Sequence, residues 1–353
     1  SIGNNEYKKR YLNDWDFNNT IKQLLNDAFM SRNYMGNVLV TNNLYLNQLY
    51  ECIKNNLWYE HFKRVLASNA LTGQNWIDFE SEIANSIKEM EAAPYKRPLE
   101  QLANTSPTIL QQYLSAIRKS VFLVTIKDLN NATLVLHTDL NRLTRALEIY
   151  LSVFVSKIKI NKPIIDLENQ LFDYVLSFNY TNTYERIFKK KITPQTEICY
   201  VHGKANKDAT IENCNLVLGI DEYLLGDKKN TQLTFLPFKK FYQRIHKYTD
   251  NSYSKWIDDI YDCATDGTRR NKFELHIFGH SLDVTDKDIL RKFILNQNVQ
   301  TKIYYHRKDE DDKSDLNSKI RNLLKIIEQD ELVRRTGGGL GNTIEFIPQK
   351  VGI

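Results

Sequence analysis

The sequence predicts an α/β fold in which a parallel sheet follows a large helical region. Three observations lead to this prediction. The first 160 of the 353 residues place apolar side chains mostly at helical spacing. After residue 160, short apolar runs alternate with helical stretches, as they do in proteins with parallel sheets. Several of these runs lack strict alternation of apolar and polar residues, which is typical of strands buried on both faces.

Residues 1–160 are expected to form a mainly helical cap or insertion. The widest apolar stripe in this region runs from Leu140 to Phe154. Thr138 and Asp139 directly precede it, and we expect them to cap the start of that helix. Further amphipathic stretches occupy residues 17–30, 44–53, 57–66, 75–90 and 107–126.

Residues 161–353 are expected to form the α/β domain. Six apolar runs are predicted to be its strands. They are "FDYVLSF" (172–178), "EICYV" (197–201), "NLVLGI" (215–220), "FELHIFG" (273–279), "TKIYYH" (301–306) and "TIEFI" (343–347). Helical stretches separate several of these runs, which favours parallel strands joined by crossover helices.

Polar residues and glycines follow four of the predicted strands. In open parallel sheets, ligands bind at the carboxyl ends of the strands. An amide, an imidazole, carboxylates, hydroxyls and glycines brought to one edge would suit a nucleotide, with its ribose hydroxyls and phosphates. The residues are Ser177, Asn179 and Thr181 after the first run, His202 and Gly203 after the second, Gly219, Asp221 and Glu222 after the third, and Gly279, Ser281, Asp283 and Asp286 after the fourth.

Each of these residues also has an ordinary structural interpretation. Asn179 is of a type that forms turns and caps helices, and His202 before a glycine is typical of a turn. Asp286 is placed to cap a helix at residues 287–296. The functional interpretation is favoured because the same arrangement recurs at four strand ends in one half of the chain.

Composition excludes several classes of protein. The formal charge of +5 is mild for this length, and no long basic block is present, so a nucleic-acid partner is not expected. The four cysteines are widely spaced, which argues against a disulfide framework or a zinc site. With few cysteines, no secretory signal and no apolar run of the ~18 residues that a membrane span needs, a cytoplasmic protein without membrane contact is expected.

Lysine and arginine beside aromatic residues leave a nucleic-acid-directed toxin as a further alternative. The stretches concerned are residues 188–191, 238–247 and 268–272. We interpret them as solvated helix faces and loops. A steep salt dependence of DNA or RNA binding would be the sign of the alternative.

Five motifs together resemble the bacterial abortive-infection AbiH family. They are "NWIDFESEI" (75–83), "LSFNYTNTYE" (176–185), "YVHG" (200–203), "LVLGIDE" (216–222) and "IFGHSLDVTDKDIL" (277–290), in the order expected for that family. The resemblance implies a Rossmann-like sheet related to that of sirtuins. Members of the family also open with a strand and a glycine-rich turn, of which only "SIGNNE" (1–6) is reminiscent here.

The "FNYT" and "HG" motifs also resemble those of sirtuin-like NAD hydrolases in antiphage defence. The resemblance implies that Asn179 and His202 are catalytic, that NAD is substrate or ligand, and that no metal is required. It implies an antiphage effector that cleaves NAD, with an activating phage component or self-assembly as its control. The alternative is a defence-system sensor or regulatory module that binds a nucleotide without catalysis.

Overall fold

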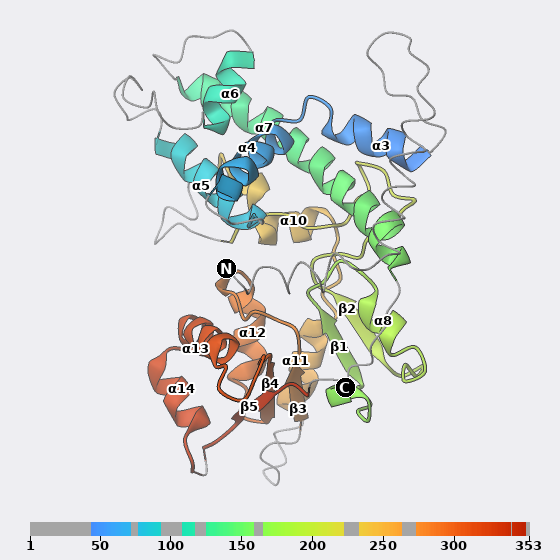
Figure 1. Cartoon of the computed structure of the whole chain (residues 1–353), viewed down its shortest axis with the longest axis vertical. Coiled ribbons are helices and arrows are strands. Elements are labelled where there is room, and N and C mark those ends of the chain that lie inside the picture. The colour runs from blue at the N-terminus through green and yellow to red at the C-terminus, as the bar shows by residue number, and fades with distance from the viewer. Residues whose placement is uncertain are drawn as a thin grey trace. The chain divides into compact units, whose positions relative to one another are not determined.

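The computed structural model describes residues 44–71, 77–92, 108–116, 125–158, 165–221, 233–262, 273–339 and 341–350. The chain divides into two compact units (Figure 1). The helical unit comprises residues 1–159, 180–182 and 202–249, and the sheet unit comprises residues 160–179, 183–201 and 250–353. Residues 202–249, which the sequence analysis assigned to the α/β domain, therefore belong to the helical unit.

Helices build the core of the helical unit (Figure 1). They are α3 (Leu44–Ile53), α4 (Leu57–Leu71), α5 (Phe79–Ala92), α6 (Ile109–Ala116), α7 (Ile126–Ile149) and α10 (Lys240–His246). The apolar faces of α4, α5, α6 and α7 meet in one cluster that includes the fully buried Trp58, Ile83, Leu136 and Phe238, whereas α3 packs in a separate cluster around Ile149. After Ile149, α7 continues into a π-helical turn, Tyr150–Phe154.

Helix α7 begins at Ile126, upstream of the predicted start. The Thr125 hydroxyl accepts a hydrogen bond from the Asp128 amide, and the Asp128 carboxylate accepts one from the Thr125 amide. This reciprocal capping box satisfies two amides that a helix start otherwise leaves without a partner. The prediction that Thr138 and Asp139 cap this helix was wrong, because both lie in its middle.

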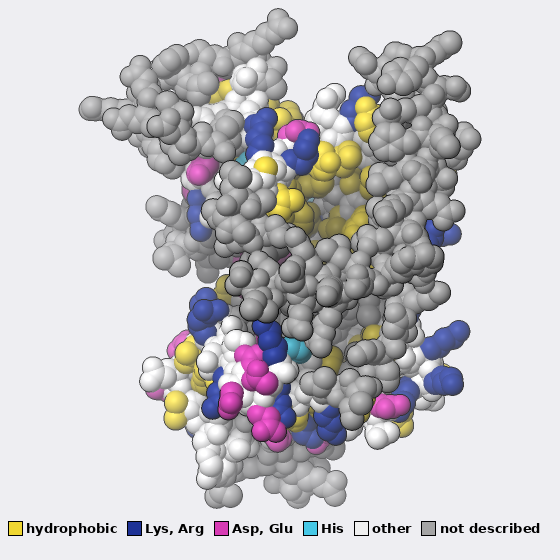
Figure 2. Space-filling view, in the orientation of Figure 1, with side chains coloured by type: hydrophobic (Ala, Val, Ile, Leu, Met, Phe, Trp, Pro, Cys, Tyr) yellow, Lys and Arg dark blue, Asp and Glu magenta, His cyan; other side chains and the backbone are white. Residues whose placement is uncertain are grey.

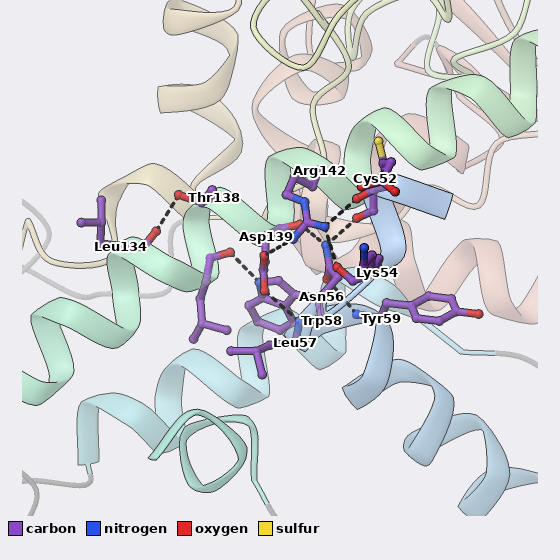
Figure 3. A network of polar contacts seen from close by, with 12 residues as sticks. Cys52, Lys54, Asn56, Leu57, Trp58, Tyr59, Leu134, Thr138, Asp139 and Arg142 are labelled. Atoms are coloured by element: carbon purple, nitrogen blue, oxygen red, sulfur yellow. Dashed lines mark hydrogen bonds and ion pairs between the residues drawn. The ribbon is translucent and has the colours of Figure 1, made fainter. Parts of the chain in front are cut away.

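Asp139 instead joins α7 to the turn between α3 and α4 (Figure 3). One carboxylate oxygen accepts a hydrogen bond from the Leu57 amide at 2.8 Å, and the other pairs with Arg142 at 3.0 Å. Arg142 Nη2 also donates to the carbonyls of Glu51 and Lys54, both at 2.6 Å. One buried carboxylate and one guanidinium thus satisfy the end of α3 and the start of α4.

Asn56 completes the same junction from the other side. Its Oδ1 accepts a hydrogen bond from the Tyr59 amide, as an N-cap residue does, while its Nδ2 donates to the carbonyls of Cys52 and Asp139. The neighbouring Trp58 donates its indole N–H to the Leu136 carbonyl at 2.8 Å. Figure 3 shows these side chains converging on one stretch of α7.

Among the described residues of the sheet unit, parallel strands form two small sheets. Strand β1 (Tyr174–Ser177) pairs with β2 (Glu197–Tyr200), and β3 (Phe273–Ile277), β4 (Val299–Tyr305) and β5 (Ile344–Pro348) pair in that order. The helices of this unit are α8 (Thr183–Ile187), α11 (Tyr253–Asp262), α12 (Lys287–Ile294), α13 (Ser314–Ile327) and α14 (Gln329–Thr336). The chain is therefore a mixed α/β protein with small parallel sheets and many helices.

One predicted strand, residues 215–220, forms no strand ladder in the part of the chain that the structure describes. Its end carries an isolated parallel bridge between Ile220 and Lys239. The Gln243 side chain satisfies the backbone of Leu218 by accepting from its amide and donating to its carbonyl, both at 3.0 Å. A side-chain amide thus replaces the neighbouring strand that the pattern predicted.

The end of β1 shares its core with the other sheet. Phe178 directly follows β1 and packs against two hydrophobic clusters of the sheet unit. Leu275 of β3 packs against the same two clusters, whose buried members include Ile277, Ile303 and Leu323. Figure 2 shows basic and acidic side chains interspersed on the visible face of this unit.

Substituting Asp139 with Ala is expected to lower the free energy of unfolding by about 3 kcal/mol, because Arg142 and the Leu57 amide lose a buried partner. Urea denaturation measures this loss. Glu60→Ala is the control, since Glu60 pairs with Lys63 on the exposed surface and its loss is expected to cost at most about 0.5 kcal/mol. Equal losses in the two variants would contradict the importance of the junction.

Glu331 in α14 is expected to make the stability of the protein depend on pH in the acid range. Hydrogen bonds from Arg334 and Arg335 lower the pKa of the Glu331 carboxyl from 4.5 to about 2. A lowered pKa stabilises the fold above the unfolded-state value, and the stabilisation is lost as the pH falls toward the folded-state value. The difference in unfolding free energy between the wild type and Glu331→Gln should therefore be largest above pH 4.5 and shrink as the pH falls toward 2.

Denaturation curves at pH 6 and at about pH 3.5, between those two values, would measure this difference. Glu310→Gln, in an exposed loop, is the matched control. A difference that stays constant between the two pH values would contradict the assignment.

Candidate functional site

The ends of β1 and β2 carry the two residues that the sequence analysis singled out for catalysis. Ser177 lies opposite Tyr200 in the parallel register, and the Val201 amide donates to the Ser177 carbonyl at 3.1 Å. Asn179 follows Ser177 by two residues and is exposed, whereas His202 follows Tyr200 by two residues and is only 5% exposed. The boundary between the units falls at these ends, so Asn179 counts with the sheet unit and His202 with the helical unit.

Within the sheet unit, the end of β1 meets the turn that follows β3. The rings of Phe178 and His280 pack edge to face, with centroids 4.4 Å apart and planes at 69°. Phe178 immediately precedes Asn179, and Gly279 immediately precedes His280. The end of β1 and the turn after β3 are thus in direct contact within the sheet unit.

Helix α13 holds the turn after β3 through two backbone carbonyls. The buried Lys319 donates to the His280 carbonyl at 2.8 Å, and Asn322 donates to the Ser281 carbonyl at 3.0 Å. Gly279 and Leu282 both adopt positive φ, at 68° and 58°. Positive φ is unusual for a leucine, and here the side chain is fully buried in the core, which holds the backbone in place.

The side chains of this turn differ in their exposure. Ser281 and Asp283 are exposed, and Asp283 accepts a hydrogen bond from the Thr285 amide at 3.0 Å. Asp286 is buried and does not cap α12 with its side chain. Its carboxylate faces the His280 imidazole, with Oδ2 3.4 Å from Nε2. The ordinary structural alternative for Asp286, a side-chain cap of the following helix, is therefore not observed, because the carboxylate faces the histidine instead.

His280 is the residue of this turn that sequence reasoning missed. It lies between Gly279 and Ser281, both predicted to bind a ligand, but the sequence offered no spacing that marked it. The relevant signal is three-dimensional, since its partner Phe178 lies far earlier in the chain.

In the helical unit, the segment after β2 is held by backbone contacts around His202. The His202 carbonyl accepts a hydrogen bond from the Val217 amide at 2.9 Å. The Tyr180 hydroxyl donates to the Val217 carbonyl at 2.6 Å, and the Tyr180 ring lies 6.4 Å from the His202 ring. Tyr180, the residue after Asn179, thus belongs to the surroundings of His202.

A buried ion pair on α7 fixes the loop that follows His202. Arg145 and Glu148 are 2.6 Å apart and are 3% and 0% exposed. Arg145 donates to the carbonyls of Asn206 and Lys207, both at 2.8 Å, while Glu148 accepts from the Asn206 amide. Because breaking such a buried pair leaves an uncompensated charge, this clamp strongly constrains the loop.

The remaining predicted residues occupy varied surroundings. Gly219 is required by packing, because a Cβ there would lie 2.5 Å from the Phe238 carbonyl oxygen. Ser177 donates its hydroxyl to the Asn179 carbonyl at 3.1 Å. Thr181 and Asp221 are half-buried in the helical unit. Glu222 lies outside the described residues, as does the stretch 1–6.

The described residues contain neither a candidate metal site nor a helix able to span a membrane. They contain no group of three or more His, Cys, Asp or Glu side chains able to hold a metal ion. None of the described helices has both the length and the apolar character needed to cross a membrane.

Small parallel sheets together with many helices define the chain as a mixed α/β protein. Within that class, the sequence profile described as "Bacteriophage abortive infection AbiH" matches residues 9–306, so the chain belongs to the AbiH family. Membership indicates a role in bacteriophage abortive infection. Neither the curated proteins nor the solved structures contain a match.

The two positive-φ glycines give a matched test of the strand ends. A Cβ at Gly203 would lie 2.2 Å from the Asn215 carbonyl oxygen, whereas at Gly279 no described atom lies within 4 Å of that position. Gly279→Ala should therefore cost only the backbone strain of about 1–2 kcal/mol. Gly203→Ala should cost clearly more, because backbone must also move. Thermal denaturation of both variants would measure the difference, and equal losses would contradict this account.

Proposed function

We propose that this AbiH-family protein is an antiphage effector that binds NAD and hydrolyses its nicotinamide–ribose bond. The contact between Phe178 and His280 carries the proposal, because it joins the strand end bearing Asn179 to the glycine turn after β3. We further propose that the parallel strands belong to a Rossmann-like sheet, in which such ends are the expected ligand site.

Exposure at these strand ends leaves them accessible to a ligand. Asn179, Gly279, Ser281 and Asp283 are all exposed in the sheet unit. Around Gly279, no described atom lies within 4 Å of the position that a Cβ would take. A ligand could therefore approach this backbone closely, with the Ser281 hydroxyl and the Asp283 carboxylate offering partners for phosphate and ribose.

The proposed chemistry needs a positioned water and a proton acceptor. The bond between the ribose C1′ and the nicotinamide nitrogen breaks through an oxocarbenium-like state, and its electron pair leaves with neutral nicotinamide. Water forms the new C1′–oxygen bond. In the proposal, Asn179 orients this water or a ribose hydroxyl, and His202 accepts the proton that the water loses. Imidazole suits that role in general, since this type of side chain takes up and releases a proton close to neutral pH.

Family membership supports the same proposal on biological grounds. An effector of abortive infection must harm the infected cell, and loss of NAD would do so. Such an enzyme has to be inactive in healthy cells, so we propose control by a phage component or by self-assembly.

Asn179→Ala and His202→Ala are each expected to lower the rate of nicotinamide release from NAD by about 10²–10⁴-fold, the range of general acid–base help. The assay is run with purified protein alone, at raised concentration, and with lysate of phage-infected cells. Asn317→Ala, on an exposed face of α13, is the matched control and should keep full activity.

The outcomes separate the alternatives. Near-normal release by either catalytic variant would refute its assigned role. If the wild type binds NAD in calorimetry but releases no nicotinamide under any of the three conditions, the protein is a non-catalytic nucleotide sensor.

A further inference from the structure

The protonation of His280 follows from its hydrogen bonds. The Leu282 amide donates to Nδ1 at 2.9 Å, so Nδ1 carries no proton. In the neutral ring the proton must then lie on Nε2, which faces Asp286 Oδ2 at 3.4 Å. Both ring nitrogens are thereby engaged within the turn, so the imidazole is held in one orientation.

The backbone of the turn that carries His280 is held rigidly. The carbonyl of His280 itself is fixed by Lys319, and the next carbonyl by Asn322. The side chain of Leu282, two residues after His280, is buried in the core of the sheet unit and anchors the turn there. The imidazole therefore projects from a turn that three independent contacts hold in place.

The imidazole ring of His280 contacts the end of β1. Its edge-to-face contact with Phe178 restrains the last residue before Asn179. Asn179 is exposed, and the Ser177 hydroxyl holds its carbonyl rather than its side chain. The backbone direction from which the Asn179 side chain projects thus depends on how Phe178 is packed.

We propose that His280 is a positioning residue, which Asp286 orients and which acts on the ligand through Phe178 and Asn179. This inference rests on the proposed function for the role of Asn179. It assigns no direct contact with the reacting atoms to His280. A displacement of a catalytic group by about 1 Å can cost about 10²-fold in rate, and that is the size of effect expected here.

His280→Asn is the most informative variant. The Asn side chain can still accept a hydrogen bond from the amide two residues later, as in an Asx turn, so the turn itself is preserved. It lacks the ring that reaches Phe178 and Asp286. His246→Asn is the matched control, because His246 is an exposed histidine in the last turn of α10.

The test combines two readouts on the full chain. Nicotinamide release gives kcat and KM, and calorimetry with ADP-ribose gives affinity and stoichiometry. The variants are His280→Asn, Asp286→Asn, Asn179→Ala and the double variant of positions 179 and 280. We expect His280→Asn to lower kcat about 10²-fold and to weaken ADP-ribose binding measurably, but by no more than Asn179→Ala does, at an unchanged stoichiometry. Asp286→Asn should have a smaller effect in the same direction.

Non-additivity is the sign that His280 acts through Asn179. In the double variant, the loss of ADP-ribose affinity should equal that of Asn179→Ala alone. Additive losses would show that His280 contacts the ligand independently, and wild-type behaviour of His280→Asn would show that it positions nothing. A reduced stoichiometry would reveal a merely misfolded fraction. Each of these three results overturns the proposal.

Failure of this inference can be told apart from failure of the proposed function. If the wild type binds ADP-ribose without releasing nicotinamide, the hydrolase proposal fails while the affinity cycle still decides the role of His280. If the wild type cleaves NAD and His280→Asn equals it, only the inference fails. If the wild type neither cleaves NAD nor binds ADP-ribose, both are refuted.

Discussion

A charge buried on α7 is the constraint around which the helical unit is organised. The Asp139 carboxylate cannot remain without partners in an apolar core, and it finds them in the α3–α4 turn and in Arg142. The same helix carries the Arg145–Glu148 pair less than two turns later, which holds the loop after His202. One helix thus links the packing of the helical core to the segment that bears a candidate catalytic residue.

In the sheet unit, other contacts hold the backbone beneath the strand ends in place. Its strand ends are polar and exposed, yet the backbone beneath them is tied by Lys319 and Asn322 from α13 and by apolar anchors. An enzyme needs this combination, since reacting groups must be accessible while their orientation is held to within a fraction of an ångström. Helix α13, which lies between β4 and β5 in the chain, therefore holds the backbone of the turn at the candidate site.

Sequence reasoning found features that depend on local pattern. Apolar runs of strand length located β1 to β5, because each strand is a short apolar stretch bounded by turn residues. It misplaced the start of α7, since Thr138 and Asp139 have the composition of a cap but are used in a tertiary junction. It expected a strand at 215–220, where the partner is the Gln243 side chain. His280 went unnoticed because its importance arises from a contact with a distant residue.

Leu282 combines a left-handed backbone with a fully buried apolar side chain. A substitution that satisfies one of these two requirements fails to satisfy the other. Glycine would relax the backbone but empty part of the core, while any other branched residue would keep the volume and retain the strain. A gain in stability at this position thus requires a simultaneous change in the neighbouring packing, so single substitutions of Leu282 are expected to lower stability. The turn that orients His280 is expected to drift slowly, even where the surrounding surface diversifies in the contest with phage.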